Sequence, residues 1–436
     1  MTTQTSSQTL KLRSEDQPTT VKAVPLDKEI ENIIRSSKNI FVGSKPSEKL
    51  SFGPDPEGLE ILPTATRQRL EESGIDISKG YPSKPDKSKI PVYLDEAAAI
   101  RTDTYPFVER AKNADPEKKA LLGAAKEVIH LTKHIGTEIV GLQLSELTDK
   151  QKDELALLIS ERVVVFFREQ KLSPQKQREL GEYYGRVEKH PQAVRVNGLD
   201  GVSVIWSNYS TKKSKRPLTF KNVNYGNFNS NKYTGGTDDW HTDLTHENQP
   251  PGVTHLHLDA IPDVGGDTYW GSGYAAYDKL SEEFKKFLDG KKATYVSLHG
   301  YLDRNDPFAG PKKIERVHPL VRTNPATGWK SLFLNRKYTK RILGVSPVES
   351  DIILNYLFDV YEKNADIQVR FKWGPTKPGY GVSALWDNRV SIHRTVWDYE
   401  GQDERHGTRV TSLAEVPYFD PESKSQREAL GLPLDE

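Results

Sequence analysis

An alternation of apolar and polar residues between Ile367 and Trp373 places the strongest constraint on the fold of this chain. Every second residue in this segment is large and apolar, and the residues between them are polar. Because the side chains of a β-strand point alternately to its two faces, the pattern predicts a half-buried strand of an antiparallel sheet. The run Val163–Phe167 is apolar throughout, short and rich in β-branched residues, which predicts a strand buried on both faces. Sheets are therefore expected to form the core.

Other segments carry weaker patterns that indicate further strands and helices. Further strands are expected at 138–142, 253–258, 268–270 and 332–334. Helices are expected at 149–161, at 274–289 and after two Ser-Pro pairs that are typical helix starts, Ser173-Pro174 and Ser346-Pro347. Glu349 completes a capping box in the last helix, whose apolar side is expected to contain Ile352, Ile353, Tyr356, Leu357 and Val360.

Strands predominate between residues 116 and 416, and the helices are inserted between them without regular alternation. We therefore expect a mainly β fold with peripheral helices and an antiparallel two-sheet core, a double-stranded β-helix or jelly roll. Residues 1–115 are rich in Ser, Thr, Lys and Pro, which predicts a partly disordered extension with short helices near 26–36 and 65–73. This extension could dock a partner or wrap the domain at 116–416, and residues 417–436 are expected to form a tail.

The composition excludes several classes of protein. The chain has no cysteine, which removes disulfides, thiolate metal sites and iron–sulfur clusters, so a metal would need nitrogen and oxygen ligands. The 62 Lys and Arg residues nearly cancel the 61 Asp and Glu residues, so no overall field favours nucleic acid or an anionic membrane. No segment approaches the roughly 18 apolar residues of a membrane span, and the N-terminus lacks the pattern of a targeting signal. A cytoplasmic location is expected.

Sulfur is almost absent from the chain, because Met1 is the single methionine among 436 residues. Compositional drift or avoidance of oxidation could explain this. Our sharper hypothesis is sulfur sparing, in which a protein made during sulfur shortage contains almost none. It predicts a higher abundance of the protein in sulfur-starved than in sulfur-replete cells, and equal abundance would remove its support.

The segment Trp240-His241-Thr242-Asp243 carries the strongest candidate for a functional site. On an extended segment, His241 and Asp243 point to the same side. One imidazole and one carboxylate are two of the three ligands in the 2-His-1-carboxylate triad, which holds Fe(II) with open coordination positions. Spacing alone does not choose this pair, because His257-Leu258-Asp259 repeats it and short motifs often belong to structural histidines.

Five motifs together resemble, in their order and rough spacing, those of the taurine/2-oxoglutarate-dependent dioxygenase family. They are Trp240-His241-Thr242-Asp243, Gly265-Gly266-Asp267-Thr268, His318 to Thr323, Trp386 to Arg389 followed by His393, and Arg405 with Arg409. The segment Val164–Gln170 is similar to the N-terminal strand and turn of that family, and the likeness covers about residues 130–415. With its long extension, the chain resembles the fungal sulfonate dioxygenases.

The resemblance implies roles for the matching residues. His241, Asp243 and His393 match the ligands of Fe(II), whereas His257 occupies a position where the family has an ordinary strand residue. Thr268 and Arg405 match the residues that hold 2-oxoglutarate, which with O2 is a co-substrate. A guanidinium suits a carboxylate because it can donate two parallel hydrogen bonds, and a hydroxyl adds a third. No protein acid or base separate from the metal centre is required.

The resemblance also implies a substrate pocket. Arg409 matches the residue that binds the substrate's sulfonate, and His190 matches a pocket histidine. On a strand, Arg405 and Arg409 face the same side, so one cavity can contain two anion sites. Ala193 and Thr237 stand where the taurine enzyme has tyrosine and asparagine around the amine of its substrate. An isethionate, a longer alkanesulfonate or a sulfate ester therefore becomes plausible in place of taurine.

The implied function is hydroxylation of an organosulfonate next to sulfur, which releases sulfite and an aldehyde, with succinate and CO2 as co-products, for sulfur assimilation. The same chemistry on an alkyl sulfate ester or a carboxylate substrate is an alternative within the class. Outside the class, the chain could be a non-enzymatic scaffold, whereas a zinc hydrolase would leave Thr268 and Arg405 without a role. The expected partner is a small molecule, and a homo-oligomer is one possible assembly because members of the family are often dimers or tetramers.

Overall fold

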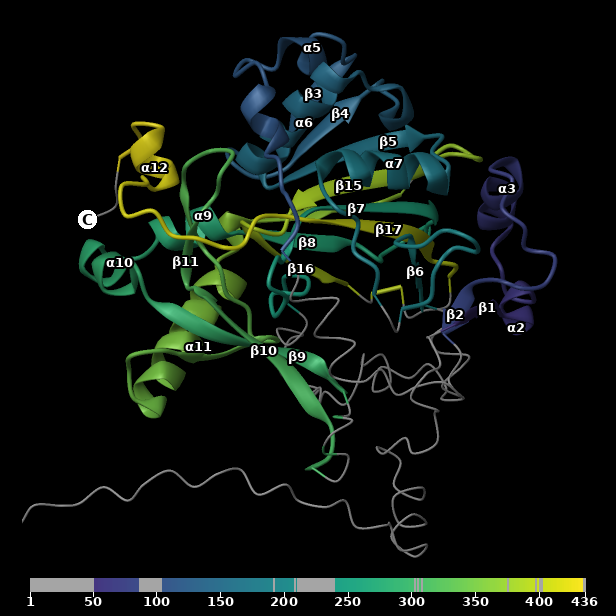
Figure 1. Ribbon diagram of the computed structural model, residues 1–436. Helices are drawn as coiled ribbons and strands as arrows, with labels where there is room; N and C mark the ends of the chain where they lie inside the picture. The colour runs from purple at the N-terminus through teal and green to yellow at the C-terminus, as the bar shows by residue number, and fades with distance from the viewer. Residues whose placement is uncertain are drawn as a thin grey trace, which may run out of the picture. The chain divides into compact units, whose positions relative to one another are not determined.

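A computed structural model describes residues 51–85, 104–190, 193–207, 209, 240–301, 303, 306, 309–374, 376–396, 398–399 and 403–433. All of them belong to one compact unit, Ser44–Glu436. The unit is mainly β with helices around its sheets, as predicted (Figure 1). The predicted helix near 26–36 and Thr237 lie outside the described residues.

A seven-stranded sheet forms the larger layer. Its strands lie in the order β3 (Glu127–His130), β4 (Thr137–Val140), β5 (Val164–Gln170), β15 (Gly381–Asp387), β7 (Pro251–Ala260), β17 (His406–Leu413) and β6 (Ser203–Trp206). Neighbouring strands are antiparallel except β4 and β5, which run parallel. The predicted strand at Val163–Phe167 is confirmed as β5. The first four residues of this strand, Val164–Phe167, are fully buried.

A three-stranded sheet packs against one face of the larger sheet. Its order is β14 (Gln368–Phe371), β8 (Thr268–Ser272) and β16 (Ser391–Thr395). Aromatic rings join the two layers, because Phe166 of β5 stacks on Phe371 with centroids 3.8 Å apart and contacts the edge of Trp270 at 5.3 Å. We call the face of the larger sheet that meets this layer the inner face.

Helices cover the opposite, outer face of the larger sheet (Figure 1). They are α6 (Asp149–Arg162) and α7 (Pro174–Tyr184), which bury Leu155, Leu158 and Leu180 against the outward side chains of β5 and β15. The Ser-Pro start predicted for α7 is confirmed, since Ser173 Oγ accepts a hydrogen bond from Lys176 N at 3.2 Å.

A long insert separates β8 from β14. It contains α9 (Gly273–Asp278), α10 (Glu282–Leu288), β9 (Lys292–Tyr301), β10 (Lys312–Pro319), β11 (Val321–Thr323), β12 (Lys330–Leu332), β13 (Thr339–Ile342), α11 (Pro347–Lys363) and the 3-10 turn η6 (Ala365–Ile367). The prediction of one helix at 274–289 is wrong. Ser281 is extended, with ψ 152°, and separates α9 from α10. The strand predicted at 332–334 ends earlier, at Leu332.

The capping box predicted for α11 is confirmed by Ser346 and Glu349, but its buried side was predicted only in part. Leu357 and Val360 are buried as expected, whereas Ile352 and Tyr356 are 65 % and 50 % exposed. Apolar residues occur on both sides of this helix, and tertiary contact buries the side that carries Leu354, Phe358 and Tyr361. Periodicity could not choose between the two sides.

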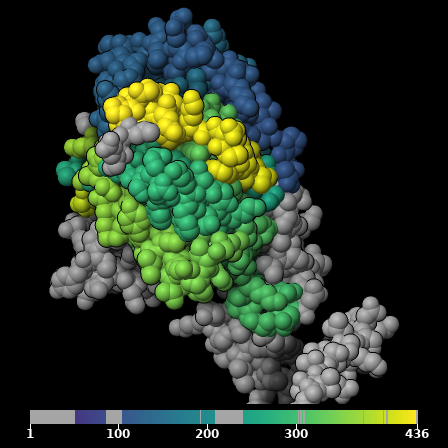
Figure 2. Space-filling view, turned by 90° about the vertical axis from the view of Figure 1, so that its left-hand side faces the viewer, coloured from purple at the N-terminus to yellow at the C-terminus, as the bar shows by residue number. Residues whose placement is uncertain are grey.

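The segments at both ends of the described chain pack on this framework. The N-terminal one contains β1 (Phe52–Pro54), α2 (Pro56–Leu59), α3 (Thr64–Glu72), β2 (Ser83–Pro85), η2 (Arg110–Asn113), α5 (Lys119–Leu122) and η3 (Leu144–Glu146). The helix predicted at 65–73 is confirmed as α3. The C-terminal segment ends with α12 (Gln426–Ala429) and lies on the surface, shown in yellow in Figure 2. No helix in the described ranges is long and apolar enough to span a membrane.

Candidate active site

His241, Asp243 and His393 converge from separate parts of the chain. Each offers a potential ligand atom within 4.8 Å of the other two. The two imidazole rings have centroids 4.3 Å apart, and His241 Nε2 lies 3.9 Å from Asp243 Oδ1. Asp243 and His393 are buried and His241 is partly exposed, so the cluster is reached from solvent beside His241.

Backbone hydrogen bonds hold the two ligand-bearing segments together. His241 N donates to His393 O at 3.0 Å, and His393 N donates to His241 O at 2.8 Å, which forms a single antiparallel bridge. The Thr242 hydroxyl donates to Ser391 O at 2.7 Å and reinforces the pairing. The chain is paired with β16 at His241 and turns at Asp243, and the two side chains lie close together on one side, as the sequence predicted.

The two carboxylate oxygens of Asp243 have different surroundings. Oδ1 accepts a hydrogen bond from Arg409 Nη1 at 3.1 Å. Oδ2 is buried and has no hydrogen-bond partner among the described residues. A buried carboxylate oxygen without a partner is costly unless a cation compensates it. The unsatisfied oxygen and the set of two imidazoles and one carboxylate fit a divalent metal ion such as Fe(II).

Strand β17 places Arg409 beside the three candidate metal ligands His241, Asp243 and His393. Arg409 lies opposite Leu256 of β7 in the register, so its side chain leaves the inner face of the larger sheet. Its side chain is 26 % exposed, so the guanidinium borders both Asp243 and solvent. Arg405 directly precedes β17 and is buried. The structure thus brings Arg409 and the three candidate ligands together.

Arg405 and Thr268 both lie near the Gly265-Gly266 turn, since Gly266 approaches the Arg405 side chain and Thr268 begins β8 after the turn. Both glycines have positive φ angles, 78° and 71°, and a Cβ atom on Gly266 would lie 3.4 Å from Arg405 Nε. Thr268 pairs with Thr395 on β16 and faces the same side as His393. The Thr268 hydroxyl accepts a hydrogen bond from Trp373 Nε1 at 3.0 Å, so its own hydrogen can be donated to a ligand.

His190 lies in the segment that follows α7 and runs beside β17. Glu188 N donates to Thr411 O at 2.8 Å, and Val187 bridges Ser412, so the chain reaches His190 alongside β17. Its ring contacts His299 of β9 edge to face, with centroids 5.4 Å apart. Sequence reasoning missed His299. Nothing in its local pattern distinguishes it, because the contact joins two segments that are far apart in the sequence.

Comparisons with known proteins agree with this geometry. The family model described as "Taurine catabolism dioxygenase TauD, TfdA family" matches residues 127–411. The chain belongs to the TauD/TfdA family. It is 36 % identical over 360 residues to a Schizosaccharomyces pombe protein named for alpha-ketoglutarate-dependent sulfonate dioxygenase activity, covering 81 % of this chain and 87 % of that one. Like other family members, it is a 2-oxoglutarate-dependent dioxygenase that uses Fe(II), 2-oxoglutarate and O2.

Further TauD/TfdA relatives extend the similarity. The alpha-ketoglutarate-dependent sulfonate dioxygenase of Saccharomyces cerevisiae is 31 % identical, covering 81 % of this chain and 84 % of that one. An alkylsulfatase of Acinetobacter baylyi is also 31 % identical, covering 66 % and 84 %. Among solved structures, a taurine dioxygenase from Burkholderia xenovorans matches with a TM-score of 0.54 and 29 % identity, over 68 % of this chain and 92 % of that one.

The second His-x-Asp motif of this TauD/TfdA protein lies on the outer face of the sheet. His257 pairs with Ser383 and Thr408 in the register, away from the metal cluster. Ser383 Oγ lies 3.0 Å from His255 Nε2 and 2.9 Å from His257 Nδ1. Burial lowers the pKa of His255 to about 3 and that of His257 well below its usual value, so both rings are neutral.

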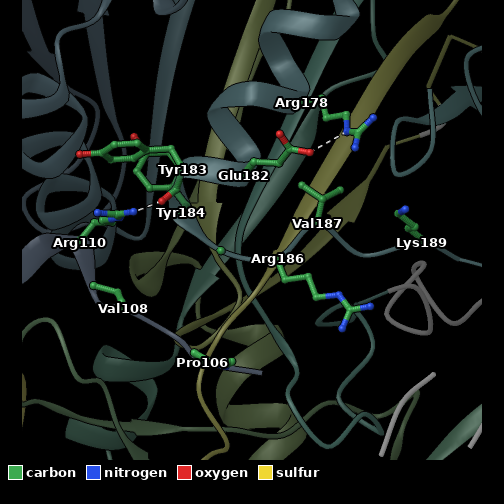
Figure 3. A pocket seen from close by; sticks show the side chains of 11 residues that line it. Pro106, Val108, Arg110, Arg178, Glu182, Tyr183, Tyr184, Arg186, Val187 and Lys189 are labelled. Carbon is green, nitrogen blue, oxygen red and sulfur yellow. Dashed lines mark hydrogen bonds and ion pairs between the residues drawn. The ribbon is translucent and has the colours of Figure 1, made fainter. Parts of the chain in front are cut away.

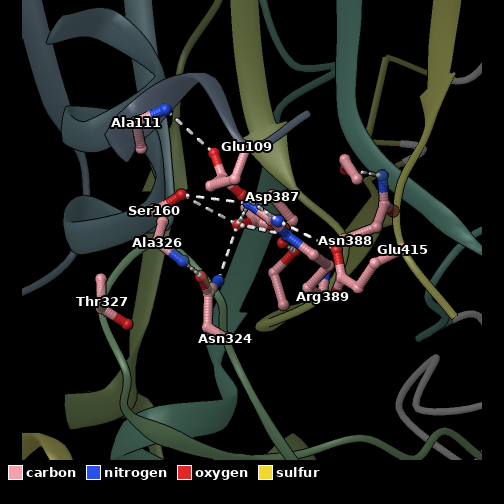
Figure 4. A network of polar contacts seen from close by, with 12 residues as sticks. Glu109, Ala111, Ser160, Asn324, Ala326, Thr327, Asp387, Asn388, Arg389 and Glu415 are labelled. Carbon is pink, nitrogen blue, oxygen red and sulfur yellow. Dashed lines mark hydrogen bonds and ion pairs between the residues drawn. The ribbon is translucent and has the colours of Figure 1, made fainter. Parts of the chain in front are cut away.

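Residues of the Trp386 to Arg389 motif form a buried network of polar contacts (Figure 4), and Asn388 links this network to the Asp243 backbone. Asn388 Oδ1 accepts a long hydrogen bond from Asp243 N at 3.4 Å, and Asn388 Nδ2 donates to Thr254 Oγ1 at 2.7 Å. The buried Arg389 contacts Asp387 at 2.8 Å and Glu109 at 2.5 Å. The motif is visible in the sequence, but the roles of Asn388 and Arg389 depend on contacts with Asp243 and Glu109, which are distant in the chain.

A surface groove of about 460 Å³ lies on another part of this dioxygenase (Figure 3). It is lined by residues from the segments around Val108 and the end of α7, such as Arg110, Arg178 and Arg186, and includes none of the predicted site residues. Its arginines already have partners, since Arg178 Nε bonds Glu182 at 2.9 Å and Arg186 lies over the Tyr105 ring at 3.3 Å. We assign it no role in the reaction.

Proposed function

We propose that this chain hydroxylates an organosulfonate at the carbon next to sulfur, in a jelly-roll domain spanning about residues 116–416. The products are sulfite and an aldehyde, with succinate and CO2 from 2-oxoglutarate. One observation carries the proposal: the Arg409 guanidinium lies 3.1 Å from a carboxylate oxygen of Asp243. An anion held by Arg409 would therefore sit beside the metal cluster, with its neighbouring C–H bond close to the reacting centre.

In this proposal His241, Asp243 and His393 bind Fe(II). Two observations support this assignment. The potential ligand atoms lie within 4.8 Å of one another, and Asp243 Oδ2 has no hydrogen-bond partner among the described residues. When bound, Fe(II) together with 2-oxoglutarate supplies the O2 activation that C–H hydroxylation requires. The protein side chains orient the reactants and limit the access of water.

Thr268 and Arg405 would hold the distal carboxylate of 2-oxoglutarate. The Thr268 hydroxyl already accepts a bond from Trp373, which orients its hydrogen toward a second acceptor. Arg405 is buried, and a guanidinium in such a place provides both charge and paired donors for a carboxylate. A burial of this kind excludes water that would otherwise weaken the ion pair.

Arg409 and His190 would bind the substrate. Arg409 can exchange its bond to Asp243 for one to a sulfonate once a metal ion compensates the carboxylate. Hydroxylation of the adjacent carbon then gives an adduct that breaks its C–S bond, loses sulfite and leaves the aldehyde. The near absence of sulfur from the chain is consistent with a role in sulfur assimilation.

An alkyl sulfate ester is the second candidate substrate. The similarity to a protein named alkylsulfatase favours it, because a sulfate monoester offers the same anionic oxygens to Arg409. A carboxylate substrate would suit the guanidinium as well. The three classes differ in product, since a sulfonate releases sulfite, a sulfate ester releases sulfate and a carboxylate substrate releases neither.

Aerobic turnover of the iron-loaded protein with a panel of alkanesulfonates, sulfate esters and aryloxyacetates tests the proposal. We expect succinate and sulfite in equal amounts with a sulfonate, and loss of sulfite formation in Arg409→Gln. Succinate without sulfite from every sulfonate would overturn the sulfonate assignment. Substrate-dependent succinate formation without any of these products would point to an organic substrate outside the panel.

A further inference from the structure

The segment Phe52–Pro85 lies outside the residues matched by the family model, yet it packs on the sheet that carries the candidate active site. Figure 1 shows α3 beside the ends of β7 and β17. Leu70 and Tyr81 of this segment are fully buried in a cluster with Val410 of β17 and Trp206 of β6. The segment is therefore part of the folded unit.

The side chain of Arg69 on α3 forms hydrogen bonds with residues on the outer face of the sheet. Its Nη1 atom donates to Asp259 Oδ2 at 2.8 Å and to Thr408 Oγ1 at 3.0 Å, and its Nε donates to Leu172 O at 2.8 Å. The Arg69 and Asp259 side chains are only 10 % and 5 % exposed, so their interaction is weakly screened by solvent. One guanidinium thus joins β7, β17 and the loop that precedes α7 to α3.

A second chain of hydrogen bonds runs through His406, the first residue of β17. The Tyr81 hydroxyl lies 3.0 Å from His406 Nε2, and His406 Nδ1 lies 2.7 Å from Asp259 Oδ1. The Thr66 hydroxyl donates to the same Asp259 oxygen at 2.7 Å. Burial opposes the charge, but His406 and Arg69 hold the pKa of Asp259 below its usual range, so it stays ionised.

His406 and Thr408, which the segment Phe52–Pro85 contacts, are sequence neighbours of the two arginines assigned to anion binding. His406 and Thr408 contact Asp259 and Arg69 on the outer face, while Arg409 leaves the inner face. Arg405 immediately precedes the strand, and its side chain lies near Gly266. His406 follows Arg405 directly, and Thr408 directly precedes Arg409. Any shift of His406 or Thr408 along the sheet must therefore move the backbone that carries an arginine.

We propose that residues 51–85 act as a positioning clamp, in which Tyr81, Thr66 and Arg69 fix the outer face of β17 and thereby set Arg405 for 2-oxoglutarate. The proposal rests on the function proposed above, because it takes Arg405 as the 2-oxoglutarate anchor. Tyr81 is a positioning residue, since it touches His406 and not the co-substrate. The clamp gives the N-terminal extension a part in the reaction that the family model does not include.

The variant Tyr81→Phe, in the full-length and iron-loaded protein, tests the clamp because it removes only the hydroxyl that contacts His406. We expect the Kd and KM for 2-oxoglutarate to rise roughly 5-fold, the effect of one net hydrogen bond, with kcat at saturating 2-oxoglutarate and the Kd for Fe(II) unchanged. Thr66→Val should act in the same direction through Asp259. Arg405→Gln serves as the positive control and should weaken 2-oxoglutarate binding far more.

Tyr184→Phe is the matched control. The Tyr184 hydroxyl is also buried and donates to Lys152 O at 3.2 Å, but it contacts α6 and not β17. A comparable fall in the unfolding midpoint without a change in 2-oxoglutarate affinity is expected for this variant. Equal changes in both Phe variants, or unchanged 2-oxoglutarate affinity in Tyr81→Phe and Thr66→Val, would overturn the clamp. Failure of the unaltered protein to bind 2-oxoglutarate would instead refute the proposed function.

Discussion

Arg409 donates a hydrogen bond to Asp243 across 3.1 Å and so links the proposed substrate anchor to a candidate metal ligand. The two residues come from different layers, since Arg409 belongs to β17 and Asp243 to the extended segment that pairs with β16. One carboxylate therefore faces both the metal position and the guanidinium. The contact makes the electrostatics of the two sites interdependent.

Replacement of Arg409 should separate substrate binding from co-substrate binding. We expect Arg409→Gln to lower kcat/KM for the organic substrate about 10- to 100-fold, because a hydrogen bond to a charged group is lost. The KM for 2-oxoglutarate should stay nearly constant. Steady-state kinetics with each substrate varied in turn measure the split. Arg341→Gln, at an exposed position, is the control, and an equal rise in both KM values in Arg409→Gln would contradict the assignment.

Asn388 should matter for metal affinity because it contacts the backbone of the candidate ligand Asp243. Its side chain accepts from Asp243 N and donates to Thr254 Oγ1, so it ties the ligand segment to β7. We expect Asn388→Ala to weaken Fe(II) binding roughly 10-fold, in line with the loss of other outer-shell contacts. Competition with a chelator measures the change. Asn355→Ala, in an exposed position on α11, should bind iron as the unaltered protein does.

The ion pair between Glu109 and Arg389 should contribute to stability. Both side chains are buried, at 7 % and 2 % exposure, and their atoms are 2.5 Å apart. We expect Glu109→Gln to lower the unfolding free energy by about 2 kcal/mol, because it removes a charged partner from a buried guanidinium. Urea unfolding provides the measurement. The exposed pair of Glu117 and Lys119 is the comparison, and Glu117→Gln should cost less than about 1 kcal/mol.

His318 should make the protein sensitive to acid. Burial lowers its pKa to about 4 from an ordinary value of 6.5, and its Nε2 donates to Glu247 O at 2.7 Å. Between these two pH values the unfolded chain binds the proton and the folded protein does not, so stability is lost as pH falls through this window. The contribution approaches about 3 kcal/mol, since one pKa unit corresponds to about 1.4 kcal/mol.

His318→Gln should therefore flatten the dependence of stability on pH. Urea unfolding at pH 7 and pH 4.5 gives the difference in unfolding free energy, which we expect to shrink by about 2 to 3 kcal/mol in the variant. His130→Gln is the comparison: partial burial and Arg162 also lower the pKa of this more exposed ring, so its replacement should flatten the dependence by less. A pH dependence unaltered by His318→Gln would show that this ring does not stay neutral in the folded state.

Local patterns predicted several elements well. The apolar run at Val163–Phe167 and the capping box at Ser346 each specify their element through contacts within a few residues. The break at Ser281 was missed, although Ser followed by two glutamates is a helix start, because the surrounding apolar spacing also suits one continuous helix. The exposure of Ile352 was missed because burial depends on which side of α11 meets the rest of the insert.

By itself, the sequence determined the mainly β class, the family motifs and the nitrogen and oxygen chemistry of any metal site, because these depend on residue type, spacing and order. The tertiary structure alone decided that His241 pairs with His393, that His257 faces away from the cluster and that Tyr81 reaches His406. Each of these relationships joins segments far apart in the chain. They arise from sheet pairing and layer packing, which no local pattern encodes.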